Sequence, residues 1–405
     1  MLDKKELEKI KKILESCHIN FLIGSGASTD YFETLNMVES LLTELNDNQH
    51  SIDEDNFKII DCSIKYAYFQ KCIRGNLGFI DKRIAVERKI EFRNTLKNYC
   101  QFISSLNTIL TRRKTNIISK QINVFTTNMD LFLDYTLEKL NLEFNDGFYG
   151  RQNPIFSTSN FKKSVYQVSA HYDNKTELPT FNLFKIHGSV NWKLKKEIIY
   201  HDSQLDVLSR LNEIKILQES LIEIKKGITV EQLKDETKKL KVTKEIENFL
   251  RIYNELVMIN PTKEKFAFTT IDYNFYEQLR MYSNALEREN SILFVTGFSF
   301  ADEHIKEITQ RVLRSNPTLI MYVLCYSESD KYNIERLFPK SQYNNIYPIH
   351  ISESFCLKNQ ILNIFDPVAR EFDDKYFLGE EKVKEIKEQK EKETKPETKD
   401  GNGEG

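Results

Sequence analysis

The sequence FLIGSGASTD, at residues 21–30, places a glycine-rich turn directly behind a short apolar run. Gly24 and Gly26 stand two residues apart, and Ser28 follows four residues after the first glycine. Such a turn can hold a nucleotide phosphate against backbone N–H groups, or it can simply end a strand at a tight corner. The stretch leaves both interpretations open, because the fuller G-x-G-x-x-G pattern is not completed.

Further apolar runs along the chain resemble buried strands. They read INVFTT, FNLFKIHG, LVMINP, SILFVTG and LIMYVLCY, at residues 122–127, 181–188, 256–261, 291–297 and 319–326. Segments with helical periodicity separate most of these runs. Near-continuous apolar strands that alternate with helices are typical of a parallel sheet covered on both faces. The sequence therefore predicts an α/β fold with a doubly wound, mostly parallel sheet.

Helical segments are predicted before and between these strands. The spacing of the apolar side chains in residues 3–17 predicts a short amphipathic helix. Stretches at about 48–120 and 203–252 exceed what a crossover between parallel strands needs, so we expect them to form a helical cap or interaction lobe. In the second stretch a helical stripe ends at Gly227. It comprises Leu208, Leu211, Ile214, Leu217, Leu221 and Ile224.

The helix that follows is predicted to begin at Thr229, because Gln232 completes the spacing of a capping box. We expect one domain at 1–375 that includes both insertions. The tail at 376–405 is almost free of apolar residues and is predicted to be disordered or a frayed helix.

Composition narrows the class of protein. The 405 residues are 40% hydrophobic and 12% aromatic, which suits a globular chain with a sizeable core. A net charge of −2 gives no long-range attraction to nucleic acid or to a membrane surface. The six cysteines are widely scattered and include no C-x-x-C pair, which fits neither a structural zinc site nor a dense disulfide framework. With no export signal or membrane span, the chain is expected in the cytoplasm, with no metal and no zinc.

Polar residues follow four of the apolar runs. In a doubly wound sheet, ligands bind outside the carboxyl ends of the strands, so these residues are predicted to meet at one crevice. They are Gly24, Ser25, Gly26, Ala27 and Ser28; Thr126, Thr127, Asn128 and Asp130; His187, Gly188 and Ser189; and Gly297, Ser299, Asp302, Glu303 and His304.

Each group also has an ordinary structural explanation. Asn128 and Asp130 can cap the helix that follows them, and His187 can be a hydrogen-bonded core histidine. Asp302 and Glu303 can be first-turn acids favoured by the helix dipole. The ordered occurrence of all four groups at successive strand ends favours a functional site over four unrelated caps.

The motifs together resemble the sirtuin superfamily. Its members share a Gly-Ala-Gly-x-Ser turn, a Thr-Gln-Asn-x-Asp segment, a catalytic His-Gly and a late Gly-x-Ser. The matching stretches here are GSGAS, TTNMD, KIHGSVNW and GFSFADEHI. The last three are most similar to sirtuin-like domains of bacterial antiphage defence systems. The resemblance implies a Rossmann-like NAD-binding domain across most of residues 19–326.

The chain departs from the sirtuin deacylases at three places. It lacks the two cysteine pairs of their zinc module, and DYFETLNMVESLL stands where they carry a Pro-Asp-Phe-Arg segment. Thr127 replaces the usual glutamine. The first two departures argue against lysine deacylation and leave water as the expected acceptor, whereas Thr127 bears on the contact to the ribose.

The resemblance also implies roles for individual residues. Asn128 orients the ribose or water, and His187 acts as the base. Asp130 contacts the carboxamide of nicotinamide, and Thr127 lies near the ribose. Backbone amides at residues 24–28 hold the pyrophosphate, while Gly297, Phe298 and Ser299 line the adenosine side.

The resulting hypothesis is an NAD+ hydrolase that acts as an abortive-infection effector. By the same resemblance it forms a homo-oligomer and partners a HerA-type hexameric ATPase, with no direct binding to nucleic acid. Two alternatives remain open: a non-catalytic module that senses NAD or ADP-ribose, and a metal-dependent nuclease subunit that uses Asp302 and Glu303.

Overall fold

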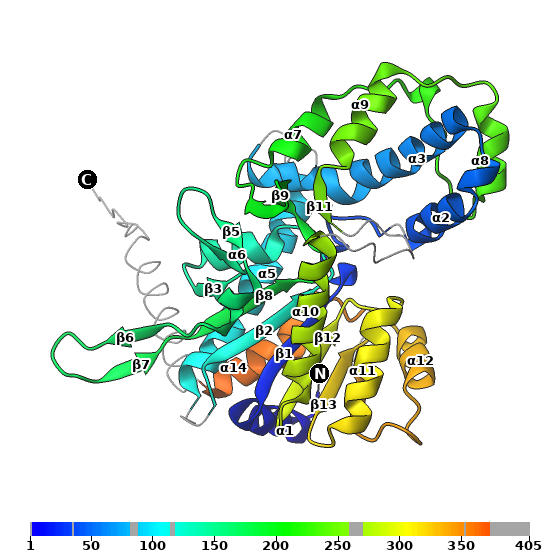
Figure 1. Ribbon diagram of the computed structural model, residues 1–405. Coiled ribbons are helices and arrows are strands. Elements are labelled where there is room, and N and C mark those ends of the chain that lie inside the picture. Colours follow the sequence, from blue (N-terminus) through cyan, green and yellow to red (C-terminus); the bar gives the residue numbers. More distant parts are fainter. Residues whose placement is uncertain are drawn as a thin grey trace, which may run out of the picture.

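A parallel sheet forms the centre of the protein. The computed structural model describes residues 2–34, 36–81, 88–113, 118–258, 270–351 and 354–372. The seven strands run in the order β14-β13-β12-β1-β2-β8-β3, and every neighbouring pair is parallel (Figure 1). Their bounds are β1 (His18–Ile23), β2 (Gln121–Thr126), β3 (Glu143–Asn145), β8 (Thr180–Lys185), β12 (Ser291–Thr296), β13 (Ile320–Leu324) and β14 (Ile346–Ile349). The predicted Rossmann-like, doubly wound α/β fold is confirmed.

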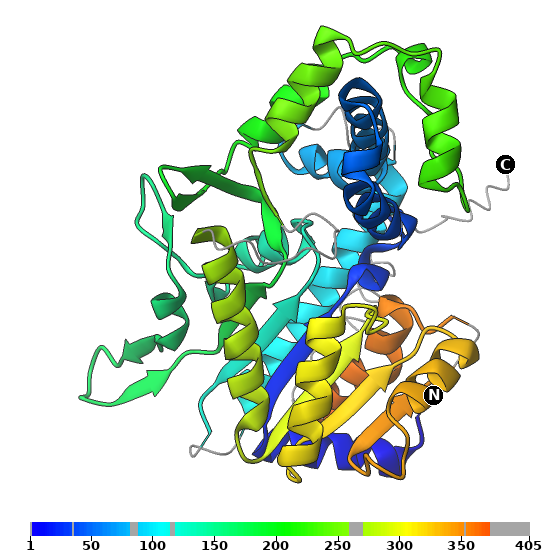
Figure 2. The ribbon, with the colours of Figure 1, turned by 45° about the vertical axis from the view of Figure 1, so that its right-hand side comes forward.

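The apolar strands are buried because helices cover both faces of the sheet (Figure 2). Along β1, Phe21 and Ile23 enter the core on one face, and Leu22 enters the core on the other. The first face is covered by α1 (Lys4–Ser16), α5 (Lys89–Arg112), α6 (Phe132–Lys139), α13 (Leu357–Gln360) and α14 (Asp366–Phe372). The second is covered by α10 (Thr270–Glu287), α11 (Glu303–Ser315) and α12 (Glu328–Leu337).

The predicted N-terminal helix is confirmed as α1. The Asp3 side chain caps it by accepting a hydrogen bond of 2.7 Å from the amide of Glu6. Leu7, Ile10 and Leu14 are buried against the sheet, as their spacing requires.

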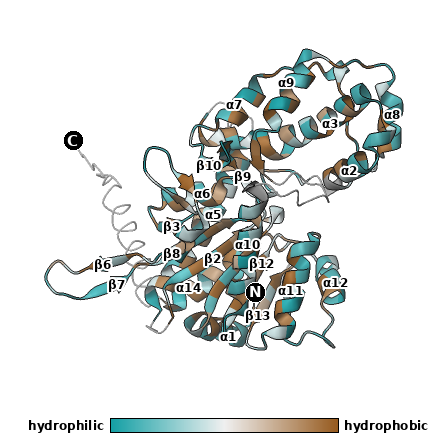
Figure 3. Cartoon of the chain, in the orientation of Figure 1, coloured by the Kyte–Doolittle hydropathy of each residue, from teal (hydrophilic) through white to brown (hydrophobic). Residues whose placement is uncertain are grey.

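A helical lobe with its own apolar core stands at one end of the sheet (Figures 1 and 2). It contains α2 (Asn36–Asp47), α3 (Glu54–Tyr68), α7 (Asp206–Glu213), α8 (Val230–Thr237) and α9 (Lys244–Tyr253). Apolar and polar stretches alternate along these helices (Figure 3), because each helix has one buried face and one exposed face. Both predicted insertions thus contribute to one lobe.

The structure changes the predicted extent of each insertion. The stretch at 48–120 divides, because α5 packs on the central sheet while α3 belongs to the lobe. The helical stripe predicted up to Gly227 is wrong beyond Glu213, where α7 ends. Leu217 is 65% exposed, so the apolar spacing there does not mark a buried helical face. The capping box of Thr229 and Gln232 is confirmed at the start of α8.

A second sheet accounts for one of the predicted strands. LVMINP was expected in the parallel sheet, but β11 (Leu256–Met258) pairs antiparallel with β9 (Gly188–Lys195). Residues 259–261 of that run lie outside the described residues. The sheet order is β11-β9-β10-β5-β4, with β10 (Ile198–His201), β5 (Ile155–Phe156) and β4 (Phe148–Tyr149). A separate hairpin, β6 (Tyr166–Val168) with β7 (Lys175–Glu177), projects from the body (Figure 1).

The predicted tail at 376–405 lies outside the described residues. In the described ranges, no helix combines the length and the apolar character that crossing a membrane would require.

Candidate active site

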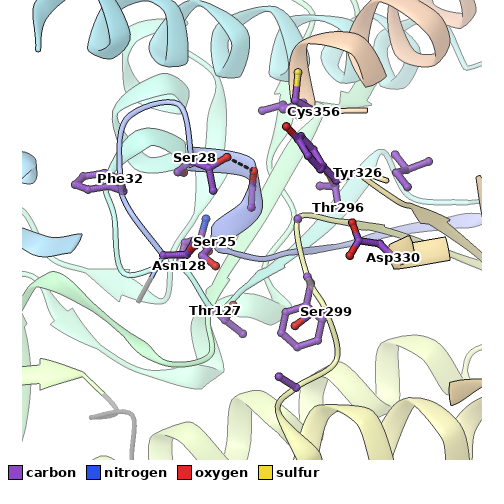
Figure 4. Close-up of a pocket in the computed structure, with 18 of the residues that line it drawn as sticks. Ser25, Ser28, Phe32, Thr127, Asn128, Thr296, Ser299, Tyr326, Asp330 and Cys356 are labelled. Carbon is purple, nitrogen blue, oxygen red and sulfur yellow. Dashed lines mark hydrogen bonds between the residues drawn. The ribbon is translucent and has the colours of Figure 1, made fainter. Parts of the chain in front are cut away.

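A cavity of about 700 Å³ lies at the carboxyl ends of β1, β2, β8 and β12. The chain reverses its direction across the sheet between β1 and β12, and such switch points are the usual ligand sites of doubly wound folds. In Figure 4, Ser25, Thr127 and Asn128 lie on one side of the cavity, and Tyr326, Asp330 and Cys356 lie on the other. The predicted convergence of four strand ends is confirmed.

Of the strand-end residues that were given no individual role, Asp302 lines the cavity, whereas Thr126, Gly188, Ser189, Glu303 and His304 do not. Most of the residues that were given a role line it, and Gly24 and Ala27 do not. Those that do are Ser25, Gly26, Ser28, Thr127, Asn128, Asp130, His187, Gly297, Phe298 and Ser299. The sequence interpretation missed Tyr326, which follows β13 and could have been found by the same strand-end rule. It also missed Phe32 and Tyr68, which no local motif distinguishes from ordinary core aromatics.

The glycine turn is a corner at which two strand ends touch. A Cβ atom on Gly24 would lie 2.4 Å from the carbonyl oxygen of Gly297, which is closer than real Cβ atoms approach. Gly297 itself has a φ of +63°, and a Cβ there would lie 2.3 Å from the amide nitrogen of Ala27. Glycine is therefore required on both sides of this contact.

Only some of the backbone amides predicted to bind a phosphate at residues 24–28 are free to do so. The amides of Gly24, Gly26 and Ala27 donate to carbonyl oxygens of Thr296, Gly297 and Gly24, respectively. The segment Ser25–Ser28 is a 3₁₀ helix of four residues, which is too short for a helix dipole to contribute to phosphate binding. An amide cradle spanning all of residues 24–28 is therefore wrong, and Ser25 is the exposed member that faces the cavity.

Asp130 is held by a buried hydrogen-bond network. Its Oδ2 accepts from the Ser28 hydroxyl at 2.9 Å. Its Oδ1 accepts from the amide of Phe132 at 3.1 Å, so the capping interpretation is correct for this residue. The Tyr99 hydroxyl lies 2.8 Å from that of Ser28. Burial raises the pKa of Asp130, and the charge of Lys185 opposes this shift.

Lys185 fixes the loop that carries these residues. Its side chain is 2% exposed and its ammonium lies 2.7 Å from Oδ2 of Asp134. The same ammonium donates to the backbone carbonyl of Asp130. A buried lysine needs such partners, because an unpaired charge in the interior is very unfavourable. Lys185 therefore ties the end of β8 to the loop after β2.

Asn128 is buried without capping a helix. Helix α6 begins at Phe132, and its N-cap, Leu131, makes no side-chain hydrogen bond. Asn128 is 6% exposed, and neither its Oδ1 nor its Nδ2 has a hydrogen-bond partner among the described residues. The Tyr99 hydroxyl, which lies 2.8 Å from that of Ser28, is close enough to interact with the Asn128 side chain, but the two do not form a hydrogen bond of regular geometry. Buried amide groups are normally paired, so this side chain has hydrogen bonds left to make with a ligand in the cavity.

His187 faces the cavity from the turn between β8 and β9. Its side chain is 20% exposed, and its Nε2 lies 3.1 Å from Oδ2 of Asp302. Asp302 also caps α11, because its Oδ1 accepts from the amide of Ile305 at 3.1 Å. The first-turn position that the sequence suggested is correct for Glu303, whereas Asp302 is the N-cap and has a second contact that the sequence did not reveal.

No metal centre is found where the structure can be described. Within the described ranges, no group of three or more His, Cys, Asp or Glu side chains is arranged to hold an ion.

Together the fold and the cavity define a Rossmann-like α/β protein with a polar site at its strand switch point. Residues 122–349, more than half of the chain, match the SIR2-like domain family. The chain belongs to this family, and its members bind NAD and are generally NAD-dependent enzymes. The matched range contains Asn128, His187 and Gly297, while the glycine turn after β1 lies outside it. A comparison with curated proteins finds no match.

Proposed function

We propose that the protein hydrolyses NAD+ to ADP-ribose and nicotinamide. The observation that carries this proposal is the unpaired, buried amide of Asn128 in the same cavity as His187. A side chain buried without partners is unfavourable unless a ligand supplies them, and the SIR2-like family makes NAD the expected ligand. The absence of paired cysteines from the sequence favours water over an acyl-lysine as the acceptor.

The residue types suit cleavage of the glycosidic bond. The bond between the nicotinamide nitrogen and C1′ breaks, and nicotinamide leaves with the electron pair. Water adds to the oxocarbenium-like C1′ and loses one proton. In this scheme Asn128 orients the ribose or the water, and His187 accepts the proton. The network of Asp130, Ser28 and Tyr99 keeps the loop in place around the nicotinamide end.

Product analysis tests the reaction. Purified protein, alone and with its companion protein, is incubated with NAD+ and the products are separated by chromatography. Equal amounts of ADP-ribose and nicotinamide are expected. Deacylation of a peptide with formation of O-acyl-ADP-ribose would contradict hydrolysis, and NAD binding without turnover would favour the sensing module.

The wider role that we propose is an abortive-infection effector that depletes cellular NAD. The likeness of TTNMD, KIHGSVNW and GFSFADEHI to sirtuin-like antiphage domains supports this role. The same likeness supports a homo-oligomer that partners a HerA-type ATPase. The helical lobe is the surface that we expect to make these contacts, because it is additional to the sheet and its covering helices. Hydrogen exchange should then show its largest protection on assembly in α3, α8 and α9, and protection confined to the sheet would contradict this.

A further inference from the structure

Two residues that are 115 positions apart meet at the edge of the cavity. His187 comes from the turn after β8, and Asp302 comes from the loop after β12. The imidazole Nε2 lies 3.1 Å from the carboxylate Oδ2, and the Asp302 side chain is only 9% exposed. This pairing joins two of the four strand ends that line the cavity.

The carboxylate has a fixed orientation. Its Oδ1 accepts a hydrogen bond from the amide of Ile305, at the start of the thirteen-residue helix α11. The other oxygen, Oδ2, is therefore the one presented to His187. An ionised carboxylate only accepts hydrogen bonds, so the imidazole nitrogen that faces it must carry the proton.

We propose that Asp302 is a positioning residue that holds His187 in the tautomer with the proton on Nε2. This inference rests on the proposed hydrolysis. The tautomer leaves the lone pair of Nδ1 to accept the proton that water loses as it adds to C1′. The Nε2 proton stays on its nitrogen throughout, shared with Asp302.

The competing explanation is that Asp302 only caps α11. Asp302→Asn separates the two roles, because asparagine caps helices about as well as aspartate does. Its one side-chain oxygen can keep the bond from Ile305, which turns the NH2 group toward Nε2. Nε2 must then accept a hydrogen bond, and the proton moves to Nδ1, where it blocks the base.

The matched control is Asp3→Asn. Asp3 caps α1 in the same way, with Oδ1 accepting from the amide three residues ahead, and it is not among the residues that line the cavity. If Asp302→Asn loses activity and Asp3→Asn does not, the loss comes from the contact with His187 and not from replacing an N-cap aspartate in general.

The experiment combines kinetics with a direct view of the tautomer. We expect Asp302→Asn to lower kcat for NAD+ hydrolysis by about 10² to 10⁴, with KM and melting temperature unchanged. ¹⁵N NMR of protein labelled at its seven histidines should show His187 with the proton on Nε2, and the proton should move to Nδ1 in Asp302→Asn. The spectrum of His187→Gln identifies the signal.

The outcomes distinguish this inference from the proposed function. Wild-type kcat in Asp302→Asn, or a wild-type His187 protonated on Nδ1, would overturn the role of Asp302 while leaving hydrolysis intact. If the wild-type protein does not hydrolyse NAD+, the proposed function fails, and the NMR spectra still decide whether Asp302 sets the tautomer.

Discussion

The amide of Gly26 donates a hydrogen bond of 2.9 Å to the carbonyl oxygen of Gly297, so the turn after β1 rests directly on the turn after β12. These turns border the cavity from the two strands at the switch point of the sheet. The glycines therefore serve first to let the two backbones approach. A side chain at Gly24 or Gly297 would push the two turns apart and so change the wall of the cavity against which a ligand binds.

Gly24→Ala should disturb this contact. Gly24 has a φ of −108°, which alanine adopts freely, so the only cost is the close approach to Gly297. We expect a loss of about 1 to 3 kcal/mol in the free energy of unfolding and lower NAD turnover per folded molecule. Denaturant titration and turnover measurements check both.

Gly227→Ala is the control for this substitution. Gly227 has a φ of +85°, and a Cβ there would contact nothing within 4 Å. It should lose about 1 to 2 kcal/mol through backbone strain alone and keep full turnover. Unchanged turnover in folded Gly24→Ala would show that the contact between the two turns does not matter to the site.

Lys185→Met should destabilise the protein strongly. It leaves the carboxylate of Asp134 without the ammonium that lies 2.7 Å away, in a largely buried setting. Breaking a buried ion pair by removing one partner typically costs about 3 to 5 kcal/mol. Lys58→Met is the control, because Lys58 pairs with an exposed glutamate, Glu54, and a small effect is expected. Equal losses in the two variants, measured by urea denaturation, would contradict the structural role of Lys185.

The raised pKa of Asp146 predicts that the stability of the protein depends on pH. Burial raises its pKa from the usual 3.8 to about 6, although its carboxylate accepts a hydrogen bond from the amide of Phe148. Between about pH 4 and 6 the folded protein therefore holds a proton that the unfolded chain has released. The free energy of unfolding of the wild type, relative to Asp146→Asn, should fall as pH rises through this window and stay level above it. A difference that rises with pH in urea titrations would contradict this assignment.

The parallel sheet could be predicted because burial on both faces leaves a plain signal in the sequence. Runs such as INFLIG and SILFVTG have no polar alternation, which only a doubly covered strand can tolerate. LVM carries the same signal, yet β11 lies in the antiparallel sheet. An apolar run therefore indicates that a strand is buried, but it does not indicate which strand pairs with it. The short strands β3 and β14 are only partly buried and carry no such signal.

The candidate site could be predicted as a set of strand ends but not as a set of contacts. The position of His187 after an apolar run placed it at the crevice, whereas its pairing with Asp302 depends on how the loop after β12 turns. The same limit applies to Asn128. Its sequence position suits a helix cap, and only the start of α6 at Phe132 shows that it caps nothing.

The most direct test of the central claim is NAD turnover per folded molecule in His187→Ala and Asn128→Ala, measured beside thermal stability. We predict that each substitution lowers turnover by about 10² to 10⁴. The melting temperature should stay close to that of the wild type, because the Asn128 side chain makes no hydrogen bond and Asp302 keeps its bond from the amide of Ile305 when His187 is removed. Full turnover in folded His187→Ala would show that this cavity is not an NAD-cleaving site that uses His187.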